Sequence, residues 1–122
     1  MGTADAPSAC TCSKILKSLL HENIVSYISH EVLPDPASGA RALRIYMEYC
    51  AGGTLERIID RAARRRELVP EIRVWQYLAQ MLEALKYCHS PRTDREPVIH
   101  RDLKPSNGMC PVACSLGSAR AA

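Results

Sequence analysis

The sequence predicts an α+β fold, with a two-stranded antiparallel hairpin in its first half and helices in its second half. Two short runs rich in β-branched and aromatic residues, 24–32 and 43–48, indicate the hairpin, because a loop with two prolines and a glycine separates them. Apolar residues that recur every three or four positions over 55–62 and 72–85 indicate the helices. At 122 residues, the chain is expected to form one domain.

The elements of the first half follow from local composition. Residues 1–11 are expected to be disordered, because the start of the chain is small and polar and contains a proline. A short amphipathic helix is predicted over 13–20, where apolar side chains recur at helical spacing. The first strand then covers 24–32, a loop covers 34–39, and the second strand covers 43–48.

Two helices are predicted after the break at Gly52-Gly53. Thr54 is a suitable N-cap for the first helix, and its apolar stripe consists of Leu55, Ile58, Ile59 and Ala62. Pro70 and Glu71 suit the first turn of the second helix, which is expected to run to about Ser90. The predicted buried face of this helix consists of Ile72, Trp75, Leu78, Ala79, Leu82 and Leu85. Beyond it we expect a polar loop, an extended entry segment and a last short strand, at 91–97, 98–99 and 112–114.

Composition excludes several classes of protein. A formal charge of +3 and a pI near 8.6 are too mild for a nucleic-acid partner, and the local cluster of Arg61, Arg64, Arg65 and Arg66 is interpreted as a solvated helix end. No apolar run approaches the roughly 18 to 20 residues that cross a bilayer, so no membrane association is expected. Without a secretory signal we expect a cytoplasmic protein, with nuclear or cytoskeletal association left open. The six cysteines are then reduced thiols, and their spacing does not fit a metal site.

The segment 100–107 reads His-Arg-Asp-Leu-Lys-Pro-Ser-Asn. It resembles the catalytic loop of the eukaryotic protein kinases, and the Lys-Pro pair resembles the serine/threonine branch. The resemblance implies that Asp102 orients the substrate hydroxyl and accepts its proton. It implies that Lys104 neutralises the migrating phosphoryl group and that Asn107 gives a neutral oxygen to magnesium. The implied catalytic residues are therefore Asp102, Lys104 and Asn107, with Asn107 also the metal ligand.

The resemblance extends upstream of the motif. Residues 21–25 resemble the end of the kinase C-helix and the start of the fourth strand, and 45–55 resemble the fifth strand, gatekeeper and hinge. The hinge, the helix end at 84–89 and the loop before the motif are similar to NimA-related (Nek) serine/threonine kinases. The implied nucleotide-binding residues are Met47 as gatekeeper, Glu48 and Cys50 through backbone groups, and Met109. ATP and Mg²⁺ are the implied cofactors, and a protein is the implied substrate or partner.

The implied architecture is a partial protein-kinase-like fold. It comprises the end of the N-lobe with the C-helix and two strands, the hinge, the helical start of the C-lobe and the catalytic loop. The incomplete kinase-like domain covers 12–122, divided into an N-lobe part at 12–47, a hinge at 48–53 and a C-lobe part at 54–122. Without the other C-lobe helices, the apolar face of 72–85 is expected to lack its usual cover.

The sequence also departs from the kinase pattern. Nothing in it resembles the Gly-rich loop over the phosphates or the strand lysine that grips them. Cys12 stands where the family places the C-helix glutamate that pairs with this lysine. Ser115 stands where the family places the Asp that is the main magnesium ligand, and it follows Asn107 more closely than is usual. The metal position at Ser115 is therefore degenerate.

These departures predict a Nek-like serine/threonine kinase family member that is catalytically inactive. Each lost electrostatic group commonly costs about 10² to 10³ in rate, so the motif alone does not restore phosphoryl transfer. A non-catalytic pseudokinase scaffold or binding module and a non-functional truncated kinase remnant are the alternatives. An active kinase whose missing parts lie elsewhere is the third hypothesis.

Overall fold

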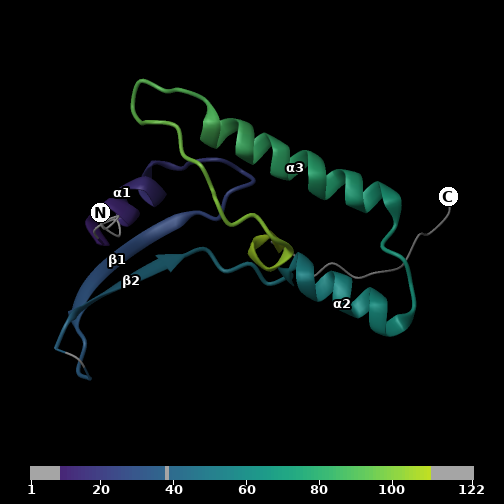
Figure 1. Cartoon of the computed structure of the whole chain (residues 1–122), viewed down its shortest axis with the longest axis horizontal. Helices are drawn as coiled ribbons and strands as arrows, with labels where there is room; N and C mark the ends of the chain where they lie inside the picture. Colours follow the sequence, from purple (N-terminus) through teal and green to yellow (C-terminus); the bar gives the residue numbers. More distant parts are fainter. Residues whose placement is uncertain (1–8, 38, 111–122) are drawn as a thin grey trace, which may run out of the picture.

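The computed structural model describes residues 9–37 and 39–110, with only the backbone described for 9–12. In chain order the elements are α1 (Ala9–Ser18), β1 (Tyr27–Pro34), β2 (Arg41–Met47), β3 (Gly53–Thr54), α2 (Leu55–Arg65), α3 (Glu71–His89), the 3₁₀ turn η1 (Pro105–Asn107) and β4 (Met109–Cys110). Figure 1 shows β1 and β2 beside α1 at one end of the molecule and the long helices α2 and α3 at the other. The predicted α+β fold class is confirmed.

The predicted hairpin is present. β1 and β2 pair antiparallel, with Tyr27 opposite Met47 and Pro34 opposite Arg41. β1 begins three residues later than expected, because residues 21–24 form a turn closed by a 3.0 Å hydrogen bond from the Ile24 N–H to the His21 carbonyl. The strand ends at Pro34, which has no N–H to continue the ladder.

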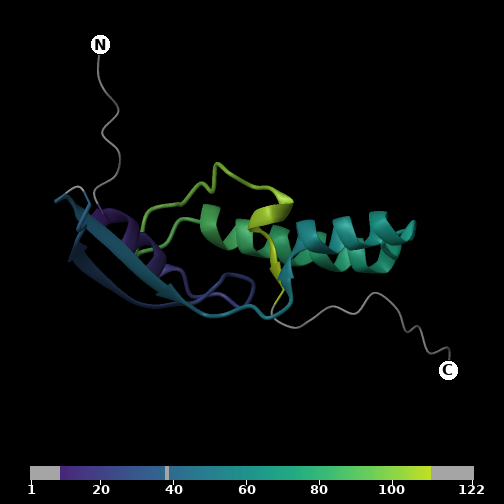
Figure 2. The ribbon, with the colours of Figure 1, turned by 90° about the horizontal axis from the view of Figure 1, so that it is seen from below.

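The first helix begins earlier than its periodicity suggested. α1 runs over Ala9–Ser18, so residues 9–11 of the range expected to be disordered are helical. Alanine, which opens this segment, is the strongest helix former, and this favours an early start. The helix ends at Ser18, whose hydroxyl donates to the Ile15 carbonyl at 2.7 Å. α1 lies beside the hairpin in both views (Figures 1 and 2).

α2 begins at the predicted cap. The Thr54 hydroxyl accepts a hydrogen bond from the Arg57 N–H at 3.2 Å, which satisfies one of the open donors of the first turn. Ile58 and Ala62, from the predicted stripe, are buried, with 3% and 4% of their surface exposed. The helix ends at Arg65 and is followed by the C-cap Arg66, which adopts the left-handed conformation with φ 53° and donates its N–H to the Ala62 and Ala63 carbonyls.

α3 has the predicted extent but not the predicted burial. It ends at His89, one residue before Ser90. The buried face predicted for it is wrong, because Ile72 and Trp75 expose 65% and 58% of their surface and Cys88 is the buried residue of this helix. Periodicity identifies an apolar face, but burial also needs an element to cover it. The exposed stretch is the uncovered face that the kinase resemblance implied for 72–85.

The buried residues of the described part of the chain are few, and they are distributed over α1, the hinge, α2, the end of α3 and β4. They are Ser13, Leu19, Cys50, Ile58, Ala62, Cys88 and Cys110. In the described part of the chain, no helix has the length and apolar character needed to cross a membrane.

Candidate active site

The segment that carries the kinase-like motif connects the end of α3 with the start of α2 (Figures 1 and 2). At its entry, the Val98 N–H donates to the Cys88 carbonyl at 2.8 Å. At its exit, the Leu55 N–H donates to the Gly108 carbonyl, also at 2.8 Å. Backbone hydrogen bonds therefore hold both ends of the loop against helices.

A second set of backbone contacts ties the loop to the hinge. β4 pairs antiparallel with β3, with Cys110 opposite Gly53 and Met109 opposite Thr54. The Gly52 N–H donates to the Cys110 carbonyl at 2.9 Å. The hinge and the motif, about fifty residues apart in the chain, thus lie side by side.

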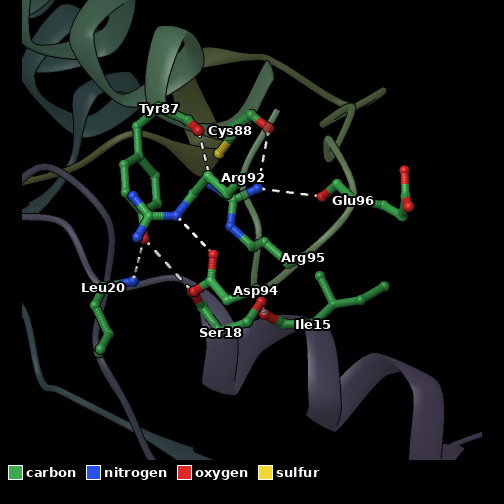
Figure 3. A network of polar contacts seen from close by, with 9 residues as sticks. All are labelled: Ile15, Ser18, Leu20, Tyr87, Cys88, Arg92, Asp94, Arg95 and Glu96. Carbon is green, nitrogen blue, oxygen red and sulfur yellow. Dashed lines mark hydrogen bonds and ion pairs between the residues drawn. The ribbon is translucent and has the colours of Figure 1, made fainter. Parts of the chain in front are cut away.

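A polar network anchors the segment before the loop (Figure 3). The Arg95 guanidinium donates to the carbonyls of Tyr87 at 2.7 Å and Cys88 at 3.2 Å, and it lies 4.7 Å from the centre of the Tyr87 ring. A cation at the C-terminal end of α3 also interacts favourably with the helix dipole. The Tyr87 hydroxyl accepts from the Leu20 N–H at 3.1 Å and donates to the Ser18 carbonyl. Tyr87 therefore links the end of α3 to the segment that follows α1.

The structure brings the three predicted catalytic residues together. Asn107 Nδ2 donates to the Asp102 backbone carbonyl at 2.8 Å and to Asp102 Oδ2 at 3.0 Å. Lys104 Nζ lies 3.3 Å from the same carboxylate oxygen. All three side chains are exposed to solvent and converge on Asp102.

The backbone around Asp102 is constrained as well. The Asp102 N–H donates to His100 Nδ1 at 3.2 Å. Arg101 has φ 63°, a left-handed conformation that a residue with a Cβ adopts at a cost on the order of 1 kcal/mol or more. The bonds made by His100 and Asn107 hold Asp102 in place against this strain.

The charge of Asp102 follows from its partners. The hydrogen bond from Asn107, followed by the hydrogen bond and the charge of Lys104, lowers the pKa of the Asp102 carboxyl. The group is therefore ionised at neutral pH and able to accept a hydrogen bond from a hydroxyl. A lowered pKa also makes it a weaker base, which suits a residue that orients a hydroxyl more than one that removes its proton early.

The predicted hinge residues Glu48 and Cys50 are held by local bonds. The Glu48 N–H donates to the Ser26 carbonyl at 2.9 Å, and the Glu48 carboxylate accepts from the Ser26 N–H at 2.8 Å. The Cys50 carbonyl accepts from Gly53 at 3.1 Å. Among residues 9–37 and 39–110, no described hydrogen bond uses the Glu48 carbonyl or the Cys50 N–H, and these backbone groups fit the adenine contacts that the resemblance implies. Burial, and secondarily the charge of Glu48, raises the pKa of the Cys50 thiol.

The two methionines predicted to bind nucleotide lie at opposite ends of this region. Met47 ends β2, opposite Tyr27, and exposes 48% of its surface. Met109 lies in β4 beside Thr54, at the far end of the hinge, and exposes 42%. Exposed apolar side chains on both sides of the hinge fit the apolar contacts that an adenine ring makes.

Two positions near the site, Gly108 and Cys110, were not predicted from the sequence. A Cβ on Gly108 would lie 2.6 Å from Leu55 Cδ1, so glycine lets the loop approach α2 closely. Cys110 is buried and bridges the loop to Gly52 through its carbonyl. The signal for Gly108 was its place directly after Asn107, at the end of the motif.

The described residues fit part of a magnesium site. Asn107 turns its amide nitrogen toward Asp102, so its carbonyl oxygen is the atom it presents, and such oxygens are ligands that Mg²⁺ prefers. No cluster of three or more His, Cys, Asp or Glu side chains suited to a metal occurs in the described part of the chain. Mg²⁺ is usually bound by one or two protein side chains together with substrate phosphates, whose charge it neutralises. Ser115, the degenerate metal position, and the side chain of Cys12 lie outside the described residues.

Comparison with known proteins places this geometry in a family. The family described as Protein kinase domain matches residues 5–113. Serine/threonine-protein kinase Nek2 of Mus musculus is 39% identical over 93 residues, which cover 76% of this chain and 20% of that protein. G2-specific protein kinase nimA of Emericella nidulans is 32% identical over 129 aligned positions, which cover 88% of this chain and 18% of that protein.

A third relative is similar over the same share of this chain as Nek2. Serine/threonine-protein kinase SSK22 of Saccharomyces cerevisiae is 37% identical over 93 residues, which cover 76% of this chain and 6% of that protein. The chain spans about a fifth of the length of the Nek2 and nimA relatives. With the motif residues assembled beside the hinge, the chain belongs to the protein kinase domain family and is similar within it to the NimA-related serine/threonine kinases.

Proposed function

We propose that this chain forms the hinge and catalytic-loop part of a NimA-related serine/threonine kinase domain that does not itself transfer phosphate from ATP and acts by binding a protein partner. The observation that carries the proposal is the Asp102 cluster. The residues that orient a hydroxyl are assembled, while the position that resembles the magnesium-binding Asp holds Ser115.

The assembled cluster supports kinase ancestry and a retained loop geometry. Asp102 is ionised, and both Lys104 and Asn107 contact the same carboxylate oxygen. This arrangement aligns a hydroxyl by hydrogen bonding and places a cation beside it. Phosphoryl transfer, however, depends on positioning and charge neutralisation more than on a base.

The substituted residues decide the expected rate. Cys12 and Ser115 replace two carboxylates of the kinase pattern, one that orients the phosphate-binding lysine and one that binds magnesium. Two losses of about 10² to 10³ each, acting independently, reduce the roughly 1 to 100 per second of a kinase to about 0.01 per second or less. Coupling between the two groups changes this figure but does not restore the missing charges.

A phosphate-transfer assay tests the catalytic part of the proposal. With Mg²⁺, labelled ATP and a basic protein substrate, the chain is expected to give the same background as Asp102→Ala. Transfer that Asp102→Ala abolishes would contradict the proposal and support an active kinase.

Thermal melting in the presence of ATP tests the metal position. We expect no magnesium-dependent rise in melting temperature for the chain and a rise for Ser115→Asp, because a carboxylate binds the ion more strongly than a hydroxyl. A magnesium-dependent rise with Ser115 in place would contradict the assignment. A melt without cooperativity by circular dichroism would instead favour the non-functional remnant.

The binding part of the proposal rests on surfaces rather than on the motif. α3 exposes several large apolar side chains, and a monomeric protein seldom leaves a large apolar surface open. A protein partner is therefore a second role that needs no catalysis.

A further inference from the structure

We infer that one face of α2 is a docking surface for an acidic segment of a protein partner. This face, called the α2 stripe, consists of Arg57, Asp60, Arg61, Arg64 and Arg65. The inference deepens the partner-binding part of the proposed function and rests on it.

The α2 stripe is a concave, strongly basic surface. Its five side chains line one depression of about 260 Å³. They recur at the spacing that places side chains on one side of a helix. Four arginines and one aspartate give the stripe a formal charge of +3, equal to the net charge of all 122 residues. The stripe thus holds four of the sixteen lysines and arginines of the chain.

The helix that carries the stripe is held from its opposite side. Ile58 and Ala62 are buried, and the Leu55 N–H is bonded to Gly108 of the catalytic loop. Thr54 caps the first turn. The stripe is therefore presented on an anchored helix.

Helix stability explains only part of this charge. Arg64 and Arg65 lie in the last turn, where cations interact favourably with the helix dipole. Arg57 lies in the second half of the first turn, near the positive end of the dipole. The pairs Arg57–Arg61 and Arg61–Arg65 have the four-residue spacing at which like charges destabilise a helix. Asp60 offsets part of this repulsion, because it lies three residues after Arg57 and four before Arg64. The remaining excess of cations on the stripe points to an external anion.

The observations favour an acidic protein segment over a nucleic acid. The pI of about 8.6 lies below the value above 9 that is typical of nucleic-acid-binding domains. The stripe also contains no aromatic side chain on which a base could stack. From Arg57 to Arg64 the helix rises about 10 Å, which matches three or four residues of an extended peptide. Asp60, between the arginines, favours a partner with a neutral or basic residue at its centre.

Fluorescence anisotropy with a labelled ten-residue peptide of glutamate and serine tests the inference without ATP or magnesium. We expect binding at low ionic strength that weakens as salt is added. The triple variant Arg57→Gln, Arg61→Gln, Arg64→Gln should lose about tenfold or more in affinity. The matched control Lys14→Gln, Lys17→Gln, Arg41→Gln removes the same charge from exposed positions of α1 and β2 and should change the affinity less than twofold.

A variant that is expected to bind more tightly distinguishes a loss of the binding site from a loss of folding. Asp60→Asn removes the only negative charge of the stripe and should increase the affinity severalfold, which an unfolded variant would not do. The inference is overturned if the peptide does not bind, if both triple variants lose affinity equally, or if a ten-nucleotide oligothymidylate binds the stripe more tightly than the peptide. Phosphate transfer by the chain would contradict the proposed lack of catalysis and leave peptide binding intact, so the two failures are distinguishable.

Discussion

At the level of single residues, Asp102 is the point on which the site depends. Its carboxylate oxygen Oδ2 receives both the Asn107 amide and the Lys104 ammonium, and its N–H is held by His100. Two donors on one oxygen stabilise the ionised form and fix the direction of the group. The residue before it, Arg101, carries the backbone strain that this orientation requires.

Replacement of Asn107 by alanine should raise the pKa of Asp102, because the Asn107 hydrogen bond is the largest cause of its lowering. Lys104→Met should raise it as well, because it removes both the hydrogen bond and the charge of Lys104. Since the pKa is lower in the folded chain, ionised Asp102 adds stability above the unfolded carboxyl value of about 3.9, and this contribution is lost as the pH falls through the folded value.

Carbon-13 NMR titration of the aspartate carboxyls measures these shifts. The Asp94 carboxyl, whose pKa is lowered by Arg92, serves as an internal control and should not move in either variant. An unchanged Asp102 pKa in Asn107→Ala would show that the Asn107 hydrogen bond does not stabilise the ionised carboxyl.

At the level of elements, the contact between the catalytic loop and α2 depends on one glycine. Gly108 lies against Leu55, and the backbone bond between these residues joins the end of η1 to the start of α2. The contact fixes how far the motif lies from the hinge.

The substitution Gly108→Ala should destabilise the fold by about 1 to 3 kcal/mol, because the new methyl group overlaps Leu55. In a Leu55→Ala background the same change should cost clearly less, since the overlapping atoms are gone. Urea unfolding of the four proteins of this double-mutant cycle gives the coupling free energy. Equal costs in both backgrounds would mean that Gly108 is required for another reason.

Comparison of the helices and strands shows which parts of the fold are determined by the local sequence. The start of α2 and the extent of α3 were predictable from Thr54 and from Pro70 with Glu71, because capping is decided by neighbouring residues. The start of β1 was not predictable, because the turn at 21–24 is closed by one backbone hydrogen bond that the side-chain pattern does not indicate. The burial of α3 was not predictable from its own sequence, because it depends on which other elements cover the helix.

At the level of the whole molecule, much apolar surface is left in contact with solvent. No large side chain of the described residues is fully buried, whereas Trp75, Ile72 and Leu82 each expose more than half of their surface. The fold therefore holds together through backbone pairing and a few buried residues. Its stability and solubility should respond strongly to anything that covers α3.

The single tryptophan, Trp75, should be accessible to acrylamide, and the chain should bind an apolar dye and self-associate as its concentration rises. The double variant Ile72→Gln, Leu82→Gln should reduce dye binding and self-association measured by sedimentation. Leu68→Gln is the matched control, because Leu68 is 93% exposed but lies between the two long helices rather than on the α3 face. An equal reduction by Leu68→Gln would show that total apolar exposure matters rather than this face.

The site was predictable in its residues more than in its connections. Asp102, Lys104 and Asn107 lie in one contiguous loop, so a sequence motif suffices to bring them together. The joining of this loop to the hinge through Cys110 involves backbone groups of residues far apart in the chain. Backbone pairings of this kind do not require particular side chains, so the sequence motif alone does not predict them.

The backbone hydrogen bond from the Val98 N–H to the Cys88 carbonyl makes the loop between them a suitable site for a peptide insertion. It closes residues 89–97 at their base, and Arg95 secures the closure from inside. Thr93, at the exposed tip, is therefore a position where a foreign peptide can be spliced into the chain. Each doubling of such a loop costs only about 0.6 kcal/mol of closure entropy. A reporter or affinity tag inserted there should not displace the motif, which begins seven residues downstream at His100.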